Sequence, residues 1–480
     1  MTKNTAIVWF RNDLRLADHP ALTAAAAAHE EIILLYVLDE RGPFARRGAA
    51  AWWLDGSLRS LRDDIEARGG RLTLRRGPGG DIVREVVDAS GARAVYWNRR
   101  YDPGGIEEDT RLKADLKADG VDVHSCNGSL LREPWELETT TGGFYKVYTP
   151  FWRSLRAAGP ARPTPLETPQ RLSTPGRPPR SDDLDDWRLT PAKPDWASGF
   201  SKVWSPGEAN ALKRLERFLN NAVGSYPDDR NRPDLEGTSR LSPHIAFGEI
   251  SPNQIWRATM AHCDRHDRDS GPADKFLSEI AWRDFAYNLL YHYPDIGVAP
   301  IKEEFASFPW RDDSDAFAKW SRGRTGIPIV DAGMRQLWHT GWMHNRVRMI
   351  VASFLCKNLL VHWGEGERWF WDTLVDADPA NNTASWQWVA GSGADAAPYF
   401  RIFNPVTQSQ KFDPSGDYIR EFVPELAKLQ SKKIHEPWTA SSDELRAAGV
   451  ALGKNYPLPI VDLGETRKRA LAAYEETRAA

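Results

Sequence analysis

The sequence contains little cysteine and no long apolar run. Its three cysteines, Cys126, Cys263 and Cys356, lie far apart and form no CxxC or metal-binding spacing. Neither a disulfide framework nor a zinc site is supported, so we expect no bound metal and a reducing, cytoplasmic environment. No apolar run approaches the ~18 residues of a membrane span, and residues 1–7 are too polar for a signal peptide.

The sequence also lacks an excess of either charge. Lysine and arginine number 63 and aspartate and glutamate 66, a formal net charge of −3, so no polybasic body indicates nucleic-acid binding through a bulk field. A mean hydropathy of −0.54 with 27% charged residues excludes a disordered or fibrous chain. The length of 480 residues is too great for one compact core and predicts two or three domains.

The first quarter of the chain alternates short apolar runs with helical stretches. Buried strands are predicted at residues 6–10, 32–38, 71–75, 94–97 and 121–125, and helices at residues 21–29, 50–68, 81–90 and 106–119. This alternation predicts a parallel α/β sheet, whose ligands normally lie at the carboxyl ends of the strands. No GxGxxG dinucleotide fingerprint follows the first run; the segment Arg-Asn-Asp-Leu-Arg at residues 11–15 stands there instead.

Proline marks the end of this pattern. Residues 160–194 contain nine prolines and little apolar periodicity, which predicts a linker wrapped over the surface. Beyond residue 206 the pattern is helical almost throughout. We therefore predict an α/β domain over residues 1–130, a connector over 131–204 and a larger all-helical domain over 205–480.

Two constellations in the helical part have a structural and a functional interpretation. Residues 237–243 place hydroxyls and a guanidinium where a helix would begin, which suits phosphate but also suits an ordinary capping turn. Glu279, Trp282 and Arg283 fall at i, i+3 and i+4 and could hold a planar base. The alternative is a surface salt bridge beside a core tryptophan.

Further polar residues follow without a hydrolase or phosphotransferase motif. Asn345, Arg348 and Met349 share a helical face, and an arginine near a core usually pairs with a buried carboxylate, for which Asp376 and Asp378 are candidates. No HExxH, nucleophile elbow or P-loop accompanies them. Eight of the 21 tryptophans lie in residues 320–388, where the simplest interpretation is a helical core.

The segments that carry these residues resemble the photolyase and cryptochrome family along nearly the whole chain. The resemblance lies in residues 8–15, 147–151, 237–242, 282–285, 325–335, 342–349 and 376–404. It implies an α/β antenna-binding domain (Rossmann-like), a connector and an all-helical domain that binds FAD. The residues that match FAD-binding positions are Tyr226, Thr238, Ser239, Arg240, Leu241, Ser242, Asn345, Arg348, Asp376, Asp378 and Asn382, with Arg348 expected to pair with Asp376.

The resemblance also implies a substrate, cyclobutane pyrimidine dimers in DNA. Enzymes of the family that repair (6-4) photoproducts carry two histidines at the positions of Asn345 and Met349, and many plant cryptochromes carry aspartate at the position of Asn382. By resemblance, Glu279 hydrogen-bonds a flipped-out dimer, Trp282 and Trp388 stack against it, and Met349 lines its pocket. The expected DNA contacts are Arg230, Glu279, Trp282, Asn345, Arg346 and Gln408.

The implied reaction is carbon–carbon bond cleavage driven by light. An electron passes from excited, reduced FAD to the dimer and returns after the cyclobutane ring opens. Trp386, Trp363 and Trp320 match the family's chain of tryptophans that reduces oxidised flavin. We expect an antenna chromophore, methenyltetrahydrofolate rather than a deazaflavin, although residues 101–105 lack the asparagine and glutamate that hold it in folate-type photolyases.

The alternative function within the family is a cryptochrome-type blue-light receptor that signals through a change in flavin redox state. The stretch after Tyr474 is short, so we expect no long signalling tail. We expect a monomer with no obligatory protein partner and no membrane association.

Overall fold

The chain forms two compact units. The computed structural model describes residues 4–266, 270–395 and 400–479. The sheet unit comprises residues 1–224, 239–294 and 375–380, and the helical unit comprises residues 225–238, 295–374 and 381–480. The predicted limits at residues 130 and 204 do not coincide with these units, because helices α9 (Pro252–His266) and α10 (Gly271–His292) pack with α6 (Glu208–Asn221) and α5 (Tyr148–Ala158) of the sheet unit.

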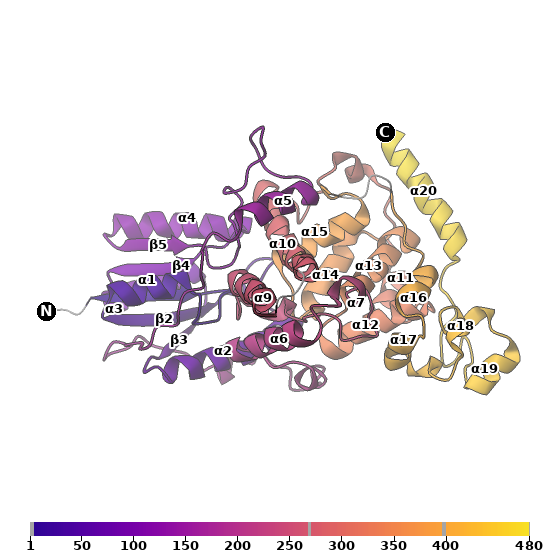
Figure 1. The fold of residues 1–480 in the computed structure, drawn as a ribbon, viewed down its shortest axis with the longest axis horizontal. Helices are drawn as coiled ribbons and strands as arrows, with labels where there is room; N and C mark the ends of the chain where they lie inside the picture. The colour runs from indigo at the N-terminus through magenta and orange to yellow at the C-terminus, as the bar shows by residue number, and fades with distance from the viewer. Residues whose placement is uncertain (1–3, 267–269, 396–399, 480) are drawn as a thin grey trace. The chain divides into compact units, whose positions relative to one another are not determined.

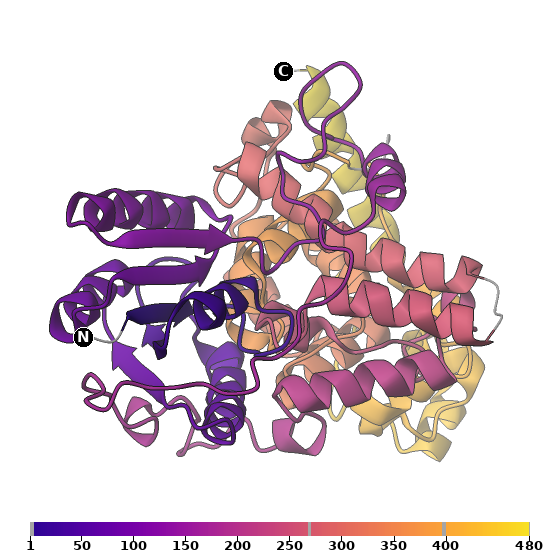
Figure 2. The same cartoon turned by 60° about the vertical axis from the view of Figure 1, so that its left-hand side comes forward.

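The sheet unit contains five parallel strands in the order β3-β2-β1-β4-β5, with helices along both faces (Figure 2). This order reverses direction between β1 and β4, as in doubly wound α/β folds. The predicted strands are confirmed to within one or two residues: β1 Thr5–Phe10, β2 Glu31–Leu38, β3 Leu72–Arg76, β4 Ala94–Asn98 and β5 Asp122–Cys126.

The helices of the sheet unit follow the strands in alternation (Figure 1). The four predicted helices are confirmed, and the unit continues with helices from the connector and from beyond it. The bounds are α1 Pro20–Ala28, α2 Gly48–Glu66, α3 Gly79–Ser90, α4 Pro103–Ala118, α5 Tyr148–Ala158, η1 Asp185–Trp187, η2 Phe200–Lys202, α6 Glu208–Asn221, α8 Ser242–Ala246, α9 Pro252–His266 and α10 Gly271–His292.

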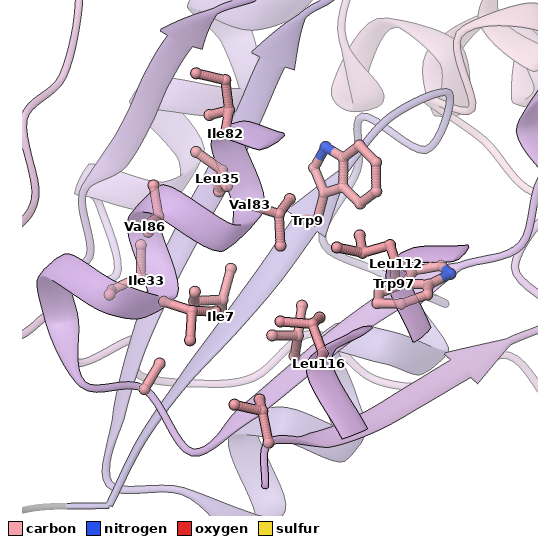
Figure 3. Close-up of a cluster of buried hydrophobic side chains, with 14 of the residues drawn as sticks. Ile7, Trp9, Ile33, Leu35, Ile82, Val83, Val86, Trp97, Leu112 and Leu116 are labelled. Carbon is pink, nitrogen blue, oxygen red and sulfur yellow. The ribbon is translucent and has the colours of Figure 1, made fainter. Parts of the chain in front are cut away.

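One apolar core lies between the sheet and helices α3 and α4 (Figure 3). Successive side chains of a strand point to opposite faces, so Ile7 and Trp9 of β1 reach the same face as Trp97 of β4. Val83 of α3 and Leu112 of α4 cover them, and each of these side chains is at least 97% buried. Strand β5 departs from the prediction of a buried strand, because it is an edge strand with half-exposed and exposed residues.

The unusual segment after β1 has a structural role. Arg15 is 1% exposed, and its guanidinium donates to the carbonyls of Asp18 at 2.7 Å, Gly128 at 2.6 Å and Gly248 at 2.8 Å. Gly248 has φ +65°, and a Cβ there would lie 2.2 Å from the Asn12 carbonyl oxygen, so the close approach requires glycine. The segment thus joins β1 to residues more than 230 positions away.

The proline-rich linker runs over the surface, as predicted, and is held to the edge of the sheet. The backbone amide of Asp182 donates to the carbonyl of Leu74 on β3 at 2.7 Å, and the amide of Leu74 donates to the Ser181 hydroxyl at 2.9 Å. These bonds occupy part of the free edge of β3, which would otherwise be open to pairing with another chain.

The helical unit is built from helices, as predicted, and the only strand-like feature among its described residues is one bridge between Leu452 and Tyr456. Helix α13 continues into a π-helix, η4, a distortion that often occurs at functional sites. The bounds are α7 Tyr226–Asp229, η3 Glu303–Ser307, α11 Ser314–Ser321, α12 Pro328–Thr340, α13 Asn345–Ser353, η4 Phe354–Leu359, α14 Trp363–Thr373, α15 Pro379–Ala390, α16 Pro405–Phe412, α17 Asp417–Phe422, η5 Pro424–Leu426, α18 Ser431–Ile434, η6 Pro437–Thr439, α19 Ser442–Ala448 and α20 Leu463–Ala479.

No helix in residues 4–266, 270–395 and 400–479 is long and apolar enough to cross a membrane. Within the same ranges, no group of three or more histidine, cysteine, aspartate or glutamate side chains could hold a metal ion.

Candidate functional site

The hydroxyl-rich motif has a backbone suited to an anion. Arg240 has φ +50°, a left-handed conformation that non-glycine residues rarely adopt, and Leu241 after it is in the right-handed helical region. Successive residues of opposite hand direct their N–H groups into one concavity, which binds anions. Thr238 and Ser239 are half-buried and Ser242 begins α8, as the motif predicts.

The preceding residues of this motif belong to the helical unit. Tyr226 begins α7 and is 7% exposed. Gly237 approaches the last residue of α7 so closely that a Cβ would lie 2.6 Å from the Asp229 Cβ and 3.0 Å from the Asp229 carbonyl oxygen. A larger residue at position 237 would displace Thr238, the first hydroxyl of the motif.

Helix α10 presents two of the three residues predicted to share a face. Glu279 and Trp282 are both half-buried, and the Glu279 carboxylate accepts a hydrogen bond from Lys275 Nζ at 2.7 Å. Arg283 is directed elsewhere: its guanidinium donates to the Ser129 carbonyl at 2.5 Å. One turn of helix separates Arg283 from Glu279, but the Ser129 carbonyl holds the Arg283 guanidinium, so the predicted trio is a pair.

Asp378 lies in a buried cluster that the sequence did not reveal. Its Oδ2 accepts a hydrogen bond from the Tyr287 hydroxyl at 2.8 Å and lies 4.0 Å from Arg283 Nε. Burial, and after it the Asp378 carboxylate, raise the pKa of Tyr287 well above its usual value, so the phenol keeps its proton and donates. Arg46 donates to the carbonyl of Ala377 at 2.6 Å. The segment with Asp376 and Asp378 is thus held in place from two directions.

Asn382 in the helical unit is 8% exposed on α15. Its Nδ2 donates to the Glu367 carbonyl at 3.0 Å, and its Oδ1 makes no hydrogen bond to a described residue. The next residue, Thr383, donates to the Glu367 carboxylate at 2.8 Å. The amide is therefore oriented by α14 and keeps an acceptor for a donor such as the N–H group of a reduced flavin.

Helix α13 carries the predicted Asn345, Arg348 and Met349. Asn345 is exposed and the other two are half-buried. Arg348 Nε donates to the Met343 carbonyl at 2.8 Å, at the turn before the helix. The predicted pair of Arg348 with Asp376 joins residues of different units and stays a prediction.

The predicted DNA contacts of the helical unit lie on neighbouring elements. Arg346 Nη2 donates to Asn231 Oδ1 at 2.7 Å, next to Arg230, and its guanidinium carbon lies 4.5 Å from the ring centroid of Phe412 on α16. Gln408 is half-buried on the same helix α16. Arg346 thus connects the two segments that carry the other candidates.

The tryptophans predicted to carry electrons are brought together only in part. The ring centroids of Trp386 and Trp320 lie 6.2 Å apart, and Phe370 contacts both rings at 5.0 and 6.3 Å. A Cβ on Gly366 of α14 would lie 2.2 Å from the Trp386 ring, so glycine makes room for this indole. Trp363 lies instead 5.2 Å from His362, in a separate aromatic group.

Two aromatic features were missed by sequence reasoning. Trp310 contacts the same His362 ring at 5.2 Å and so joins the group of Trp363. A second series leads from Trp320 to the surface, with centroid steps of 5.7, 6.3 and 6.2 Å through Phe317 and Trp369 to Trp338, which is 48% exposed. Composition indicated an excess of tryptophan, but only the folded chain orders the rings.

Trp388 lines a small cavity of about 20 Å³ at the end of α15. Lys357 of η4 lines it as well; its ammonium lies 3.0 Å from the Phe400 ring centroid and donates to the Ala390 carbonyl at 2.5 Å. Burial lowers the pKa of Lys357 well below its usual value. Residues 396–399 of the motif at 376–404 lie outside the described residues.

The stretch at residues 101–105 is engaged within the sheet unit. The Tyr101 hydroxyl donates to Glu133 at 2.7 Å, and the Asp102 carboxylate accepts from the Gly105 amide at 2.9 Å and so caps α4. The Asp102 carboxylate also pairs with Arg100 at 2.7 Å. An antenna chromophore held as in the folate-type photolyases finds no matching side chains here.

Comparisons with known proteins cover almost the whole chain. Residues 6–170 match the family model described as DNA photolyase, and residues 276–476 match the model described as the FAD binding domain of DNA photolyase. The chain is 53% identical to a deoxyribodipyrimidine photo-lyase of Agrobacterium fabrum, over 98% of this chain and 97% of the relative. It is 36% identical to Cryptochrome-1 of Arabidopsis thaliana, over 97% of this chain and 69% of the relative.

A solved structure is similar over the full length. The crystal structure of a bacterial class III photolyase from Agrobacterium tumefaciens superposes with a TM-score of 0.96 at 52% identity, covering 100% of this chain and 99% of that chain. These findings confirm the predicted family and fold class, and the FAD binding model supports FAD as the cofactor. The substrate lesion, the antenna and the roles of single residues stay predictions.

Proposed function

Because the chain belongs to the DNA photolyase family, we propose that it uses light to split cyclobutane pyrimidine dimers in DNA. The observation that carries this proposal is the pair on α10, where a carboxylate and an indole, Glu279 and Trp282, stand one turn apart and half-exposed. A carboxylate that accepts hydrogen bonds beside a flat apolar ring suits a pyrimidine lifted out of the duplex.

The residues present fit FAD. The left-handed Arg240 followed by Leu241, with the hydroxyls beside them, suits the phosphates, and the open acceptor of Asn382 suits the N–H of a reduced flavin. Asp376, Asp378, Asn345 and Arg348 complete the proposed set. FAD supplies the electron that opens the cyclobutane ring when it is excited in its fully reduced form.

The protein's own side chains bind the DNA and orient the dimer. Glu279 holds the polar edge of the dimer, while Trp282, Trp388 and Met349 offer apolar surface to its rings. Arg230, Arg346 and Gln408 contact the DNA backbone, which sets register rather than sequence preference. Since the net charge is −3, affinity depends on such local contacts and not on bulk charge.

Trp386 and Trp320 pass electrons to oxidised flavin, and Trp363 is the third predicted residue of this relay. Electrons pass between aromatic rings that lie close together. The 6.2 Å separation of the Trp386 and Trp320 ring centroids therefore supports these two residues as part of the relay. We further propose methenyltetrahydrofolate as the antenna, held by residues other than Tyr101 and Asp102.

The experiment uses the purified, photoreduced protein and an oligonucleotide with one thymine dimer. Blue light is expected to restore two thymines, and Glu279→Ala is expected to lower the repair rate about 10- to 100-fold, the cost of one hydrogen bond to a charged group. Exchange of an exposed carboxylate, Glu475→Ala on α20, is the matched control and should change nothing.

One outcome would contradict the repair function, and another would contradict only the role of Glu279. If the wild-type protein leaves the dimer intact under light, the repair function is wrong, and a light-dependent response in a repair-deficient host would then favour the cryptochrome-type receptor. If Glu279→Ala repairs normally or loses its flavin, the role of Glu279 is wrong while the repair function stands.

A further inference from the structure

Trp282 is held by a tyrosine that lies 134 positions earlier in the chain. The ring centroids of Tyr148 and Trp282 are 3.6 Å apart with an interplanar angle of 11°. Since aromatic carbons in contact lie about 3.5 Å apart, the two rings have almost no lateral offset. One face of the indole is therefore covered by the phenol ring.

Two further contacts fix the phenol in this position. The Tyr148 hydroxyl is hydrogen-bonded to the backbone carbonyl of Ser278 and lies 2.9 Å from the Ser278 hydroxyl, one helical turn before Trp282. Phe285 packs edge-on against both stacked rings, at 5.7 Å from each centroid. Tyr148 is 7% exposed, so these contacts hold the phenol within the protein interior.

Helix α5 packs against α10, and the two helices lie close together in Figure 1. Tyr148, Phe151 and Leu155 recur along one face of α5 and are buried. Phe151 contacts Phe285 at 5.3 Å but makes no ring contact with Trp282 among the described residues. Among the described rings of α5, Tyr148 is the one stacked on the indole.

We infer that Tyr148 is a positioning residue that holds Trp282 as a rigid stacking platform for the flipped-out pyrimidine dimer. This inference rests on the proposed function. A side chain that is already ordered loses little conformational freedom when a base stacks on it, so the stack favours binding. Without the phenol, the indole can rotate about its side-chain bonds into the vacated space and must be ordered again by the substrate.

The test compares three variants that share one interface. Tyr148→Leu removes the stacked ring, Tyr148→Phe keeps the ring and removes the hydroxyl, and Phe151→Leu removes an aromatic ring from the same α5–α10 contact without touching Trp282. The measurements are the dissociation constants for dimer-containing and undamaged oligonucleotides, the repair KM and kcat, the flavin content and the melting temperature.

Tyr148→Leu is expected to weaken binding of the damaged oligonucleotide about 3- to 10-fold, the range of aromatic pair energies, and to raise KM accordingly. Binding of undamaged DNA, kcat and flavin content should stay close to wild type. Tyr148→Phe should retain most of the preference for damaged DNA, and Phe151→Leu should lower the melting temperature while leaving that preference unchanged.

The inference is overturned if Tyr148→Leu keeps the wild-type preference, or if Phe151→Leu reduces it equally, because the effect would then be general packing. A wild-type protein without preference for dimer DNA would instead refute the proposed function. Should Tyr148→Leu not accumulate, Tyr148→Met removes the ring with a longer and more flexible side chain and carries the same expectation.

Discussion

Asp284 is expected to make the stability of the sheet unit fall as the pH rises toward neutrality. This carboxyl on α10 is 2% exposed. Its Oδ2 accepts hydrogen bonds from the Leu131 amide at 2.7 Å and the Arg132 amide at 3.2 Å. Its Oδ1 has no hydrogen-bond partner among the described residues. Burial, which outweighs the nearby Arg283, raises the pKa of Asp284 from 3.8 to about 7.

The sign and size follow from proton linkage. Between pH 3.8 and about 7 the folded protein holds a proton on Asp284 that the unfolded chain has released, so stability decreases by about 1.4 kcal/mol per pH unit over that window. From pH 5 to pH 8 the loss is about 3 kcal/mol. Asp284→Asn keeps the shape and an acceptor for both amides but does not titrate, so it should lose this dependence.

The assay is the melting temperature of wild type and Asp284→Asn between pH 5 and pH 8 at constant salt. At about 2 °C per kcal/mol, the variant should gain about 5 °C relative to wild type across the range. Asp274→Asn, a more exposed carboxylate on the same helix that pairs with Arg156, is the control. Parallel curves for wild type and Asp284→Asn would refute the reasoning.

Two further predictions concern the Trp386 indole. Gly366→Ala places a Cβ 2.2 Å from that ring, so we expect overpacking to destabilise the protein by about 1–3 kcal/mol, measured as a lower melting temperature. Displacement of the ring should also slow flavin photoreduction, and an unchanged photoreduction rate would contradict the contact. Trp386→Phe should slow photoreduction of oxidised flavin at least about 10-fold, by transient absorption, while enzyme reduced beforehand repairs normally. Loss of both activities in a folded, flavin-loaded variant would contradict that separation.

Local pattern was sufficient for most elements of the sheet unit. The strands at Thr5–Phe10 and Glu31–Leu38 are fully buried runs of apolar residues bounded by turn signals, and their period and length are properties of the strand itself. Strand β5 was predicted with correct bounds but wrong burial, since its position at the edge depends on the strand order. That order results from packing and cannot be obtained from one strand.

The site residues also divide into those that local pattern placed and those whose position depends on tertiary contacts. Helical spacing placed Glu279 and Trp282 on one face correctly, because four residues span about one turn. It failed for Arg283, whose side chain pairs with Ser129 and Asp378, residues remote in sequence. The predicted series of Trp386, Trp363 and Trp320 stays a prediction, and tertiary packing adds that the Trp386 ring contacts those of Trp320 and Phe370.

The lack of a polybasic body and the lack of a dinucleotide fingerprint in the sequence can also be interpreted more closely. The lack of a polybasic body does not exclude DNA; binding through local contacts, with Arg346 beside Asn231 among the candidates, stays a proposal. Where a dinucleotide fingerprint would follow β1 stands Arg15, whose guanidinium donates to the nearby Asp18 carbonyl and to the distant carbonyls of Gly128 and Gly248.

The sequence alone determined the family, the alternation of strands and helices and the chemical types available at the site. These depend on residue identity and short-range periodicity. Only the tertiary structure decided which side chains meet: Tyr148 under Trp282, Tyr287 on Asp378 and Trp320 beside Trp386. Such contacts join residues 66 to 134 positions apart, and their geometry depends on how whole elements pack, for which no local pattern carries the information.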